Sequence, residues 1–334
     1  MAVFTWLLSK AIGRLANVPG SWAKAKGRLR PRVLPRVNFE LDRLGREPGT
    51  PHLNLGEHLS VYLVYDRPLV AVEVSGELLE MWQVTFEEAY IQAVKNVRLK
   101  LEVKELEPHV YATVGSDSAT LLLQPELLKE LDVLGDLVIW PMDALFITGS
   151  SYPGSLEKIW EVRIAEKELS EHVMDMPLVH RDGIWSEFIP EGSNWQNRAS
   201  RLLARRYNLQ KEPLQAVIAE SSDVLVPDAL WVSEEEDDAN GFTMAVHGPE
   251  LEEQLLPRCD TIMLINGIED TASGRQPDFA MLTWEEFEQL MGDRLSPADY
   301  FPVRYRAIGC PEIPQTDGAL PERFKELARK FFLR

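Results

Sequence analysis

Residues 111–150 carry the most continuous core signal in the chain, and the rest of the fold has to be arranged around them. Apolar runs alternate here with short polar breaks, which predicts a strand, a turn, a helix and a second strand in close succession. The helix is expected to begin at Pro125, because proline at the first helical position loses no hydrogen bond. The long apolar strand at 136–149 contains Pro141, which cannot donate to a central ladder, so we expect an irregularity there.

The predicted elements up to residue 190 follow the order strand, strand, helix, strands, helix, strand, helix and hairpin. Thr85 and Glu88 stand three residues apart before an apolar helical face, as in a capping box. Asp182 and Gly183 separate two short strands with the residues that a type I′ turn prefers. This order indicates an α+β fold with mixed, mostly antiparallel sheets and packed helices.

A second α+β part is expected after residue 190, where a linker-like segment changes the character of the sequence. Thr283 and Glu286 form a second capping box. The other elements expected in this part are helices at 199–209, 212–221, 249–256 and from Pro321 onward, two strands joined by an acidic loop within 228–248, strands at 260–267 and 300–309, and a loop at 268–278.

The length of 334 residues favours two domains over one. Hydrophobic residues make up 45% of the chain, which is enough to build packed cores. We place the domain boundaries at the end of the basic first segment and at the change in sequence character after residue 190. We expect a basic amphipathic helix and irregular tether at 1–37, a first α+β domain at 38–190 and a second α+β domain at 191–334.

Two blocks of the sequence suggest an internal repeat. Residues 125–136 and 249–260 align without a gap and share five of twelve residues, and each block is followed by an apolar strand. The two α+β parts would then be copies of one unit. The alternative is that Pro-Glu-Leu is simply a good helix start, used twice.

The first 36 residues hold eight Lys or Arg and no acidic residue. Residues 2–16 fit an amphipathic helix, which would dock on the body, on a partner or on a membrane surface. No run of 18 apolar residues occurs, so no helix is expected to span a membrane. The candidate membrane- or anion-binding side chains are Lys10, Arg14, Lys24, Lys26, Arg28 and Arg30.

The formal net charge of −18 arises from the rest of the chain, which nets −26 from residue 37 onward. Such an acidic body repels phosphate backbones, so we expect no nucleic-acid partner. A protein partner is expected instead, with a basic partner among the options, held by exposed aromatic side chains and an acidic loop. The candidate residues are Trp185, Trp195 and Trp231, and the loop residues Glu234, Glu235, Glu236, Asp237 and Asp238, for which a merely solvated loop is the alternative.

Sequence signatures of catalysis and cofactor binding are missing. There is no P-loop or GxGxxG phosphate motif, no CxxC or HExxH zinc pattern and no GxSxG nucleophile motif. We therefore expect no cofactor, no metal and no catalytic residue. Cys259 and Cys310 are expected as reduced thiols, and His52 and His58, with Glu57 beside them, as members of a solvated link.

Within residues 111–150, the polar turn is the part for which we consider a role in binding. Ser116, Asp117 and Ser118 offer hydroxyl, carboxylate and N–H groups to a ligand. The alternative is a hairpin-type turn in which Asp117 caps its own backbone.

Five segments occur in the order and spacing of a known family: TFEEAYIQAVKNV, YATVGSDSATLLL, PELLKEL, DLVIWPMDALFITG and MPLVHRDGIWSEF. On these segments, residues 59–190 resemble the YtpQ-like family of uncharacterised bacterial proteins. The resemblance implies a compact α+β domain in a cytosolic bacterial protein, and it implies no activity or catalytic residues.

Taken together, these observations predict a cytoplasmic, non-enzymatic protein-interaction module with an adaptor or immunity-like role. Two alternatives stay open. One is an enzyme of unrecognised type with a site between the two α+β parts, and the other is a peripheral membrane protein that attaches through residues 1–36.

Overall fold

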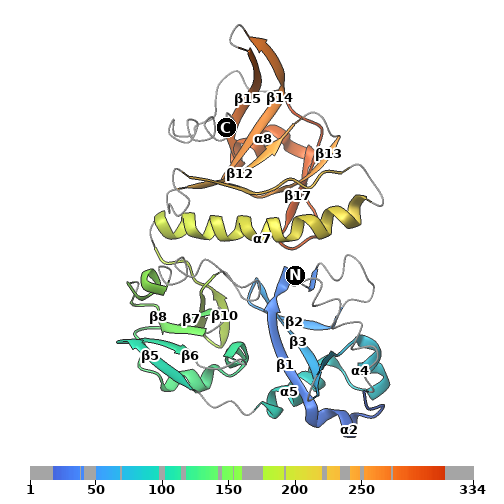
Figure 1. Cartoon of the computed structure of the whole chain (residues 1–334), viewed down its shortest axis with the longest axis vertical. Coiled ribbons are helices and arrows are strands. Elements are labelled where there is room, and N and C mark those ends of the chain that lie inside the picture. The colour runs from blue at the N-terminus through green and yellow to red at the C-terminus, as the bar shows by residue number, and fades with distance from the viewer. Residues whose placement is uncertain are drawn as a thin grey trace. The chain divides into compact units, whose positions relative to one another are not determined.

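The computed structural model of the chain divides into two compact units, Met1–Phe188 and Ile189–Arg334 (Figure 1). Both units combine helices with mostly antiparallel sheets, so the predicted α+β class is confirmed. Within the described ranges, no helix is long and apolar enough to cross a membrane. The structure describes residues 18–37, 39–40, 50–67, 70–97, 102–113, 118–141, 145–152, 154–159, 176–191, 193–219, 224–233, 241–248, 252–271 and 274–312.

The first unit contains a four-stranded antiparallel sheet with three short helices against it. Its elements are α2 (Trp22–Ala25), η1 (Lys26–Arg28), β1 (Leu29–Pro35), β2 (His52–Leu55), β3 (Leu59–Asp66), β4 (Ala71–Glu73), α4 (Gly76–Trp82) and α5 (Phe86–Asn96). β3 is the central strand and pairs with the other three. Alternate residues of β3, such as Leu63 and Tyr65, pack into a core with Ala89 and Ala93 of α5.

A six-stranded antiparallel sheet makes up most of the other described residues of the first unit, which also include a helical segment at 154–159. Its elements are β5 (Val103–Glu107), β6 (Val110–Thr113), η2 (Ser118–Leu123), η3 (Pro125–Glu130), β7 (Leu137–Pro141), β8 (Leu145–Gly149), β9 (Leu178–Arg181) and β10 (Ile184–Glu187). The strand order is β10-β9-β7-β8-β6-β5, so β10 lies at one edge. Trp140 and Ile147, from the stretch with the strongest core signal, are fully buried.

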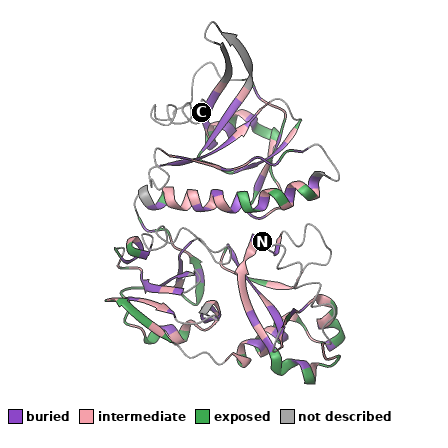
Figure 2. Cartoon of the chain, in the orientation of Figure 1, coloured by how far each residue is buried: buried purple, intermediate pink, exposed green. Residues whose placement is uncertain are grey.

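The described residues of the second unit form two sheets, a long helix and a short one. Its elements are α7 (Ser193–Ala219), β11 (Leu230–Val232), β12 (Phe242–His247), β13 (Glu253–Pro257), β14 (Thr261–Thr271), β15 (Gly274–Thr283), α8 (Trp284–Met291), η4 (Gly292–Arg294), β16 (Leu295–Pro297) and β17 (Arg304–Ile308). The sheets have the orders β11-β12-β14-β15 and β13-β17-β16, and only the β12–β14 pair is parallel. Buried residues concentrate on the strands and on one side of each helix (Figure 2).

A buried arginine joins the long helix to the sheets of the second unit. The Arg304 side chain has no exposed surface, and its guanidinium donates to Gln210 Oε1 at 2.7 Å and to the carbonyl oxygens of Tyr207, Pro227 and Leu255 at 2.8–2.9 Å. Burial lowers its pKa to about 10, so the group stays charged at neutral pH. A buried charge requires such complete hydrogen bonding, because its unpaired desolvation would be costly.

Several local predictions are confirmed. Both capping boxes form, Thr85 with Glu88 at the start of α5 and Thr283 with Glu286 at the start of α8. Asp182–Gly183 joins β9 to β10, and both residues have the positive φ that a type I′ turn requires.

Two predictions for the first unit are wrong. The supposed tether at 17–37 contains α2, η1 and β1, and β1 pairs with β3 from Leu29 to Pro35. The single long strand predicted at 136–149 is a hairpin, in which β7 and β8 pair with each other. Pro141 ends β7 instead of interrupting a longer strand, because folding back lets both apolar halves enter one core.

Three predictions for the second unit are also wrong. The helix predicted at 249–256 is strand β13 from Glu253 onward, since pairing with β17 buries its apolar residues. The loop predicted at 268–278 belongs to the ladder between β14 and β15. The two helices predicted between 199 and 221 are one helix, α7, with Pro213 inside it. In each case tertiary packing overrides local preference.

The structure does not show the duplicated unit. The first of the two aligned blocks forms a 3-10 helix at Pro125–Glu130, whereas the described part of the second forms a strand at Glu253–Pro257. The shared Pro-Glu-Leu sequence therefore leads to two different structures.

We predict that Arg304→Met lowers the free energy of unfolding of the second unit by about 3 kcal/mol, because it leaves several buried acceptors without donors. Arg306→Met is the matched control on the same strand. The Arg306 side chain is half-exposed and pairs with Glu253 at 3.2 Å, so its loss should cost less than about 1 kcal/mol. Urea unfolding of the full chain, with hydrogen exchange to assign the unit, measures both. Equal stabilities of the two variants would contradict the prediction.

Candidate functional site

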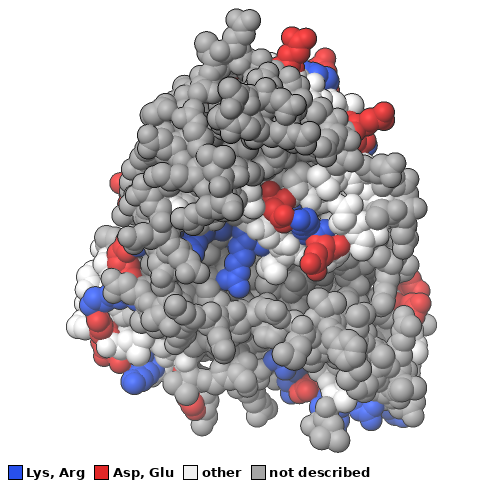
Figure 3. All heavy atoms as spheres, turned by 45° about the horizontal axis from the view of Figure 1, so that its top comes forward, with Lys and Arg blue, Asp and Glu red and all other residues white. Residues whose placement is uncertain are grey.

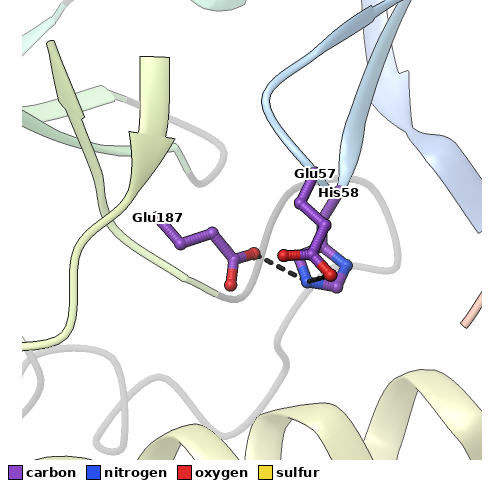
Figure 4. A group of neighbouring side chains, drawn as sticks. All are labelled: Glu57, His58 and Glu187. Carbon is purple, nitrogen blue, oxygen red and sulfur yellow. Dashed lines mark ion pairs between the residues drawn. The ribbon is translucent and has the colours of Figure 1, made fainter.

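One histidine and two glutamates converge within the first unit. Glu57 and His58 lie in the turn between β2 and β3, and Glu187 is the last residue of β10 (Figure 4). One ligand atom from each residue lies within 4.8 Å of the others. This cluster therefore joins the four-stranded sheet to the edge of the six-stranded sheet.

Backbone geometry brings the turn to the edge strand. Gly56 has a φ of +71°, and a side chain there would contact the Trp185 carbonyl oxygen at 3.4 Å. Glycine both adopts this conformation without strain and allows the close approach. On the other side, the Arg36 N–H donates to the His58 carbonyl oxygen at 2.8 Å, so the pairing of β1 with β3 extends to the cluster.

The three side chains differ in exposure. His58 Nε2 lies 2.9 Å from Glu187 Oε1 and 3.8 Å from Glu57 Oε1. The side chains of His58 and Glu187 are 7% and 18% exposed, and that of Glu57 is 67% exposed. The cluster is thus buried on the side of the sheets and open to solvent on the side of Glu57.

The arrangement permits two kinds of chemistry. A protonated His58 forms an ion pair with Glu187 that fixes the turn to β10. A neutral imidazole directs its Nε2 toward the two carboxylates, and one nitrogen with two carboxylate oxygens is a ligand set used for divalent metal ions.

Both histidines of this region were predicted to lie in a solvated link, and for His58, whose side chain is buried, that prediction is wrong. Its position next to β3 places it against β10, which the sequence does not reveal. His52 lies on β2, where its Nδ1 is 2.9 Å from the Thr50 carbonyl oxygen and its ring stacks on Phe39 with centroids 4.8 Å apart. His52 thus has a separate environment from the cluster.

Glu187 was not singled out as a site residue. Its pairing with Leu178 in the β9–β10 hairpin could be expected from the Asp182–Gly183 turn. Glu187 and His58 are 129 positions apart in the sequence and lie at different sheets. No local sequence pattern predicts their contact.

The tryptophans predicted as exposed partner contacts are not exposed, so that prediction is wrong for Trp185 and Trp195, which are 5% and 7% exposed. Trp185 alternates inward along β10, and its Nε1 donates to the Leu122 carbonyl oxygen at 2.8 Å. Trp195 packs under the Arg198 guanidinium at 4.7 Å, and Trp231 is half-buried with Arg201 over its ring at 5.7 Å.

Some of the other candidate residues are described by the structure, and the rest are not. Ser118 begins the 3-10 helix η2, and Arg30 turns its guanidinium back onto the Leu29 carbonyl oxygen at 2.9 Å. Lys24, Lys26 and Arg28 are exposed in α2 and η1. The candidates outside the described residues are Lys10, Arg14, Ser116, Asp117, Glu234, Glu235, Glu236, Asp237 and Asp238.

Comparison with known proteins adds nothing to the site, since no protein-family model, no curated protein and no solved structure matches the chain. The resemblance of residues 59–190 to the YtpQ-like family therefore stays a prediction.

A second buried histidine lies in the other unit. His247 ends β12, with Nδ1 3.0 Å from Gln254 Oε1 and Nε2 3.0 Å from the Gly309 carbonyl oxygen. Gln254 Nε2 donates to the Gly248 carbonyl oxygen, which fixes the orientation of the amide. Burial lowers the pKa of His247, while its two hydrogen bonds act in the opposite direction and Arg294 lowers it further.

We predict that the free energy of unfolding of the second unit falls as the pH drops below about 6.5. The folded pKa of His247 lies below its unfolded value, so the unfolded state takes up a proton first, and stability is lost as the pH falls through the folded pKa. His247→Gln should reduce this pH dependence, measured by urea unfolding with hydrogen exchange. His180→Gln, in the first unit, is the control. An unchanged slope in His247→Gln would refute the assignment.

Proposed function

We propose that the first unit binds one divalent transition-metal ion through His58 Nε2 and the carboxylates of Glu57 and Glu187. The observation that carries the proposal is the convergence of these three donors on one point from two separate sheets. Imidazole together with carboxylate favours zinc, iron, manganese or cobalt over calcium, which prefers oxygen ligands alone.

The distances suit such an ion. Bonds of about 2.0–2.2 Å at tetrahedral angles separate ligand atoms by about 3.4 Å. The two contacts of His58 Nε2, at 2.9 and 3.8 Å, lie on either side of that value. Because the Glu57 side chain is largely exposed, its carboxylate can adjust toward an ion without disturbing packed neighbours.

The charges also favour a cation. Glu57 and Glu187 leave two negative charges beside a neutral imidazole. A divalent ion compensates the two carboxylates, whose mutual repulsion at this separation would otherwise be unfavourable.

The ligand set also bears on the alternative of an enzyme. Three protein ligands leave a coordination position for water or substrate, as in catalytic zinc sites, whereas structural zinc sites are closed by four protein ligands. The solvent-facing side at Glu57 provides the entry path. Among the functions predicted from sequence, the enzyme of unrecognised type thus gains support. Its site would depend on a metal ion, which the sequence did not predict, and would lie inside the first unit instead of between the two parts.

We predict that the chelator-treated full chain binds one Zn²⁺ or Co²⁺, and that His58→Ala weakens binding by at least about 100-fold. Isothermal titration measures affinity and stoichiometry, and the visible spectrum of the Co²⁺ form reports the coordination number. Glu187→Gln, which keeps shape and loses charge, should weaken binding as well.

His52→Ala is the matched control, because His52 lies in the same hairpin and outside the cluster. It should bind the ion like the parent chain. The melting temperature of the parent should also rise with added ion, since an ion that binds only the folded state stabilises it. Absence of ion uptake by the parent, or equal uptake by His58→Ala, would leave the cluster as an ion pair only.

Partner binding remains a second candidate function, and one observation favours it. Ile184, on edge strand β10, is 68% exposed, the highest value among the large apolar side chains described. Exposed apolar groups on edge strands are typical of contact surfaces. The described residues on the face drawn in Figure 3 include Lys and Arg as well as Asp and Glu, so the charge that they present is mixed.

If β10 contacts a protein partner, Ile184→Ser should reduce retention of that partner at low salt, because the apolar contact is lost. Leu209→Ser, on α7 of the second unit, removes a side chain that is 50% exposed and serves as control. Pull-down with the parent and both variants measures this. Equal retention by the parent and Ile184→Ser would exclude β10 as the contact.

A further inference from the structure

The segment that leads into β1 presents three basic side chains to solvent. Lys24 lies in α2, and Lys26 and Arg28 lie in η1, and all three are exposed. We call these three residues the basic tip. The sequence has no acidic residue between 18 and 36, so no carboxylate of this segment offsets their charge.

The backbone of the basic tip is held in place by two helices. Asn96, the last residue of α5, donates through Nδ2 to the carbonyl oxygens of Lys26 and Leu29 at 2.6 and 3.1 Å. Trp82, the last residue of α4, donates through Nε1 to the Pro19 carbonyl oxygen at 2.7 Å. These hydrogen bonds hold the backbone that carries the three basic side chains against the two helices.

The same two helices carry exposed apolar side chains. Met81 on α4 is 46% exposed and Ile91 on α5 is 47% exposed. Lys95, one helical turn after Ile91, adds a fourth exposed basic group. α2, α4 and α5 lie together at one end of the first unit (Figure 1), and much of that end is exposed (Figure 2).

We propose that the basic tip, together with Met81, Ile91 and Lys95, docks on the surface of an anionic lipid bilayer. Lipid headgroups attract the basic groups, and the boundary below them accepts partly exposed apolar side chains. A nucleic-acid backbone would pair with the charges and leave the apolar groups without a partner.

The neighbouring charges set the conditions for binding. Glu77 and Glu80 on α4, and Glu87 and Glu88 on α5, are exposed and reduce the attraction, so the basic tip has to supply most of it. Binding should therefore need a bilayer rich in anionic lipid, and it should weaken with salt because exposed charges are screened. None of these residues belongs to the Glu57–His58–Glu187 cluster, so the docking is independent of the metal site.

The test is sedimentation of the full chain with vesicles that contain about 30 mol% phosphatidylserine in phosphatidylcholine, against vesicles of phosphatidylcholine alone. The parent should bind only the former. The triple variant Lys24→Gln, Lys26→Gln, Arg28→Gln should bind about 100-fold more weakly, since each basic group near the surface contributes about fivefold.

The matched control neutralises three exposed basic residues elsewhere, Lys104→Gln, Lys129→Gln and Arg258→Gln, with the same change in net charge. It should bind like the parent. A second variant, Met81→Ser with Ile91→Ser, should bind about tenfold more weakly and show a steeper salt dependence. Equal binding by the parent and the tip variant would overturn the proposal. The proposal would also be overturned if the parent chain bound a DNA duplex as tightly as the anionic vesicles and the Met81→Ser, Ile91→Ser variant bound the duplex equally well.

Discussion

The hydrogen bonding of one buried cation holds the second unit together. Arg304 reaches the long helix through Tyr207 and Gln210, and it reaches β13 through Leu255. The charge has no buried carboxylate partner among its hydrogen bonds, so carbonyl dipoles take that role. The same helix uses the amides of Asn208 and Gln215 to bind the chain between 224 and 229. Helix and sheet therefore depend on satisfied polar groups as much as on apolar contact.

The first unit uses the opposite solution at the cluster of Glu57, His58 and Glu187. There two carboxylates converge on one imidazole. When His58 is neutral, these three side chains together carry an excess of negative charge. Two like charges held close together repel each other, and their removal from water costs free energy. This excess therefore contributes little to the stability of the fold. It is well suited to a ligand that brings positive charge. This contrast is the physical reason to regard Arg304 as structural and the cluster as functional.

How far the sequence predicted the fold depended on how local each signal was. Both capping boxes and the Asp182–Gly183 turn were predicted correctly, because their hydrogen bonds join residues at most a few positions apart. The predictions failed where pairing partners lie far away: β13 bonds with β17, and β7 folds back on β8. Of the cluster, the sequence showed only that Glu57 and His58 are neighbours, and it predicted them to be solvated.

The sequence by itself determined the α+β class, the helix starts and the excess of negative charge outside a basic first segment, because these follow from residue type and short spacing. Only the tertiary structure decided which side chains are buried and which meet. It buried Trp185 and Trp195, made β1 part of a sheet, and brought Glu187 to His58. Those outcomes depend on contacts between residues distant in sequence, whose free energies are shared over whole sheets and leave no mark on any short segment.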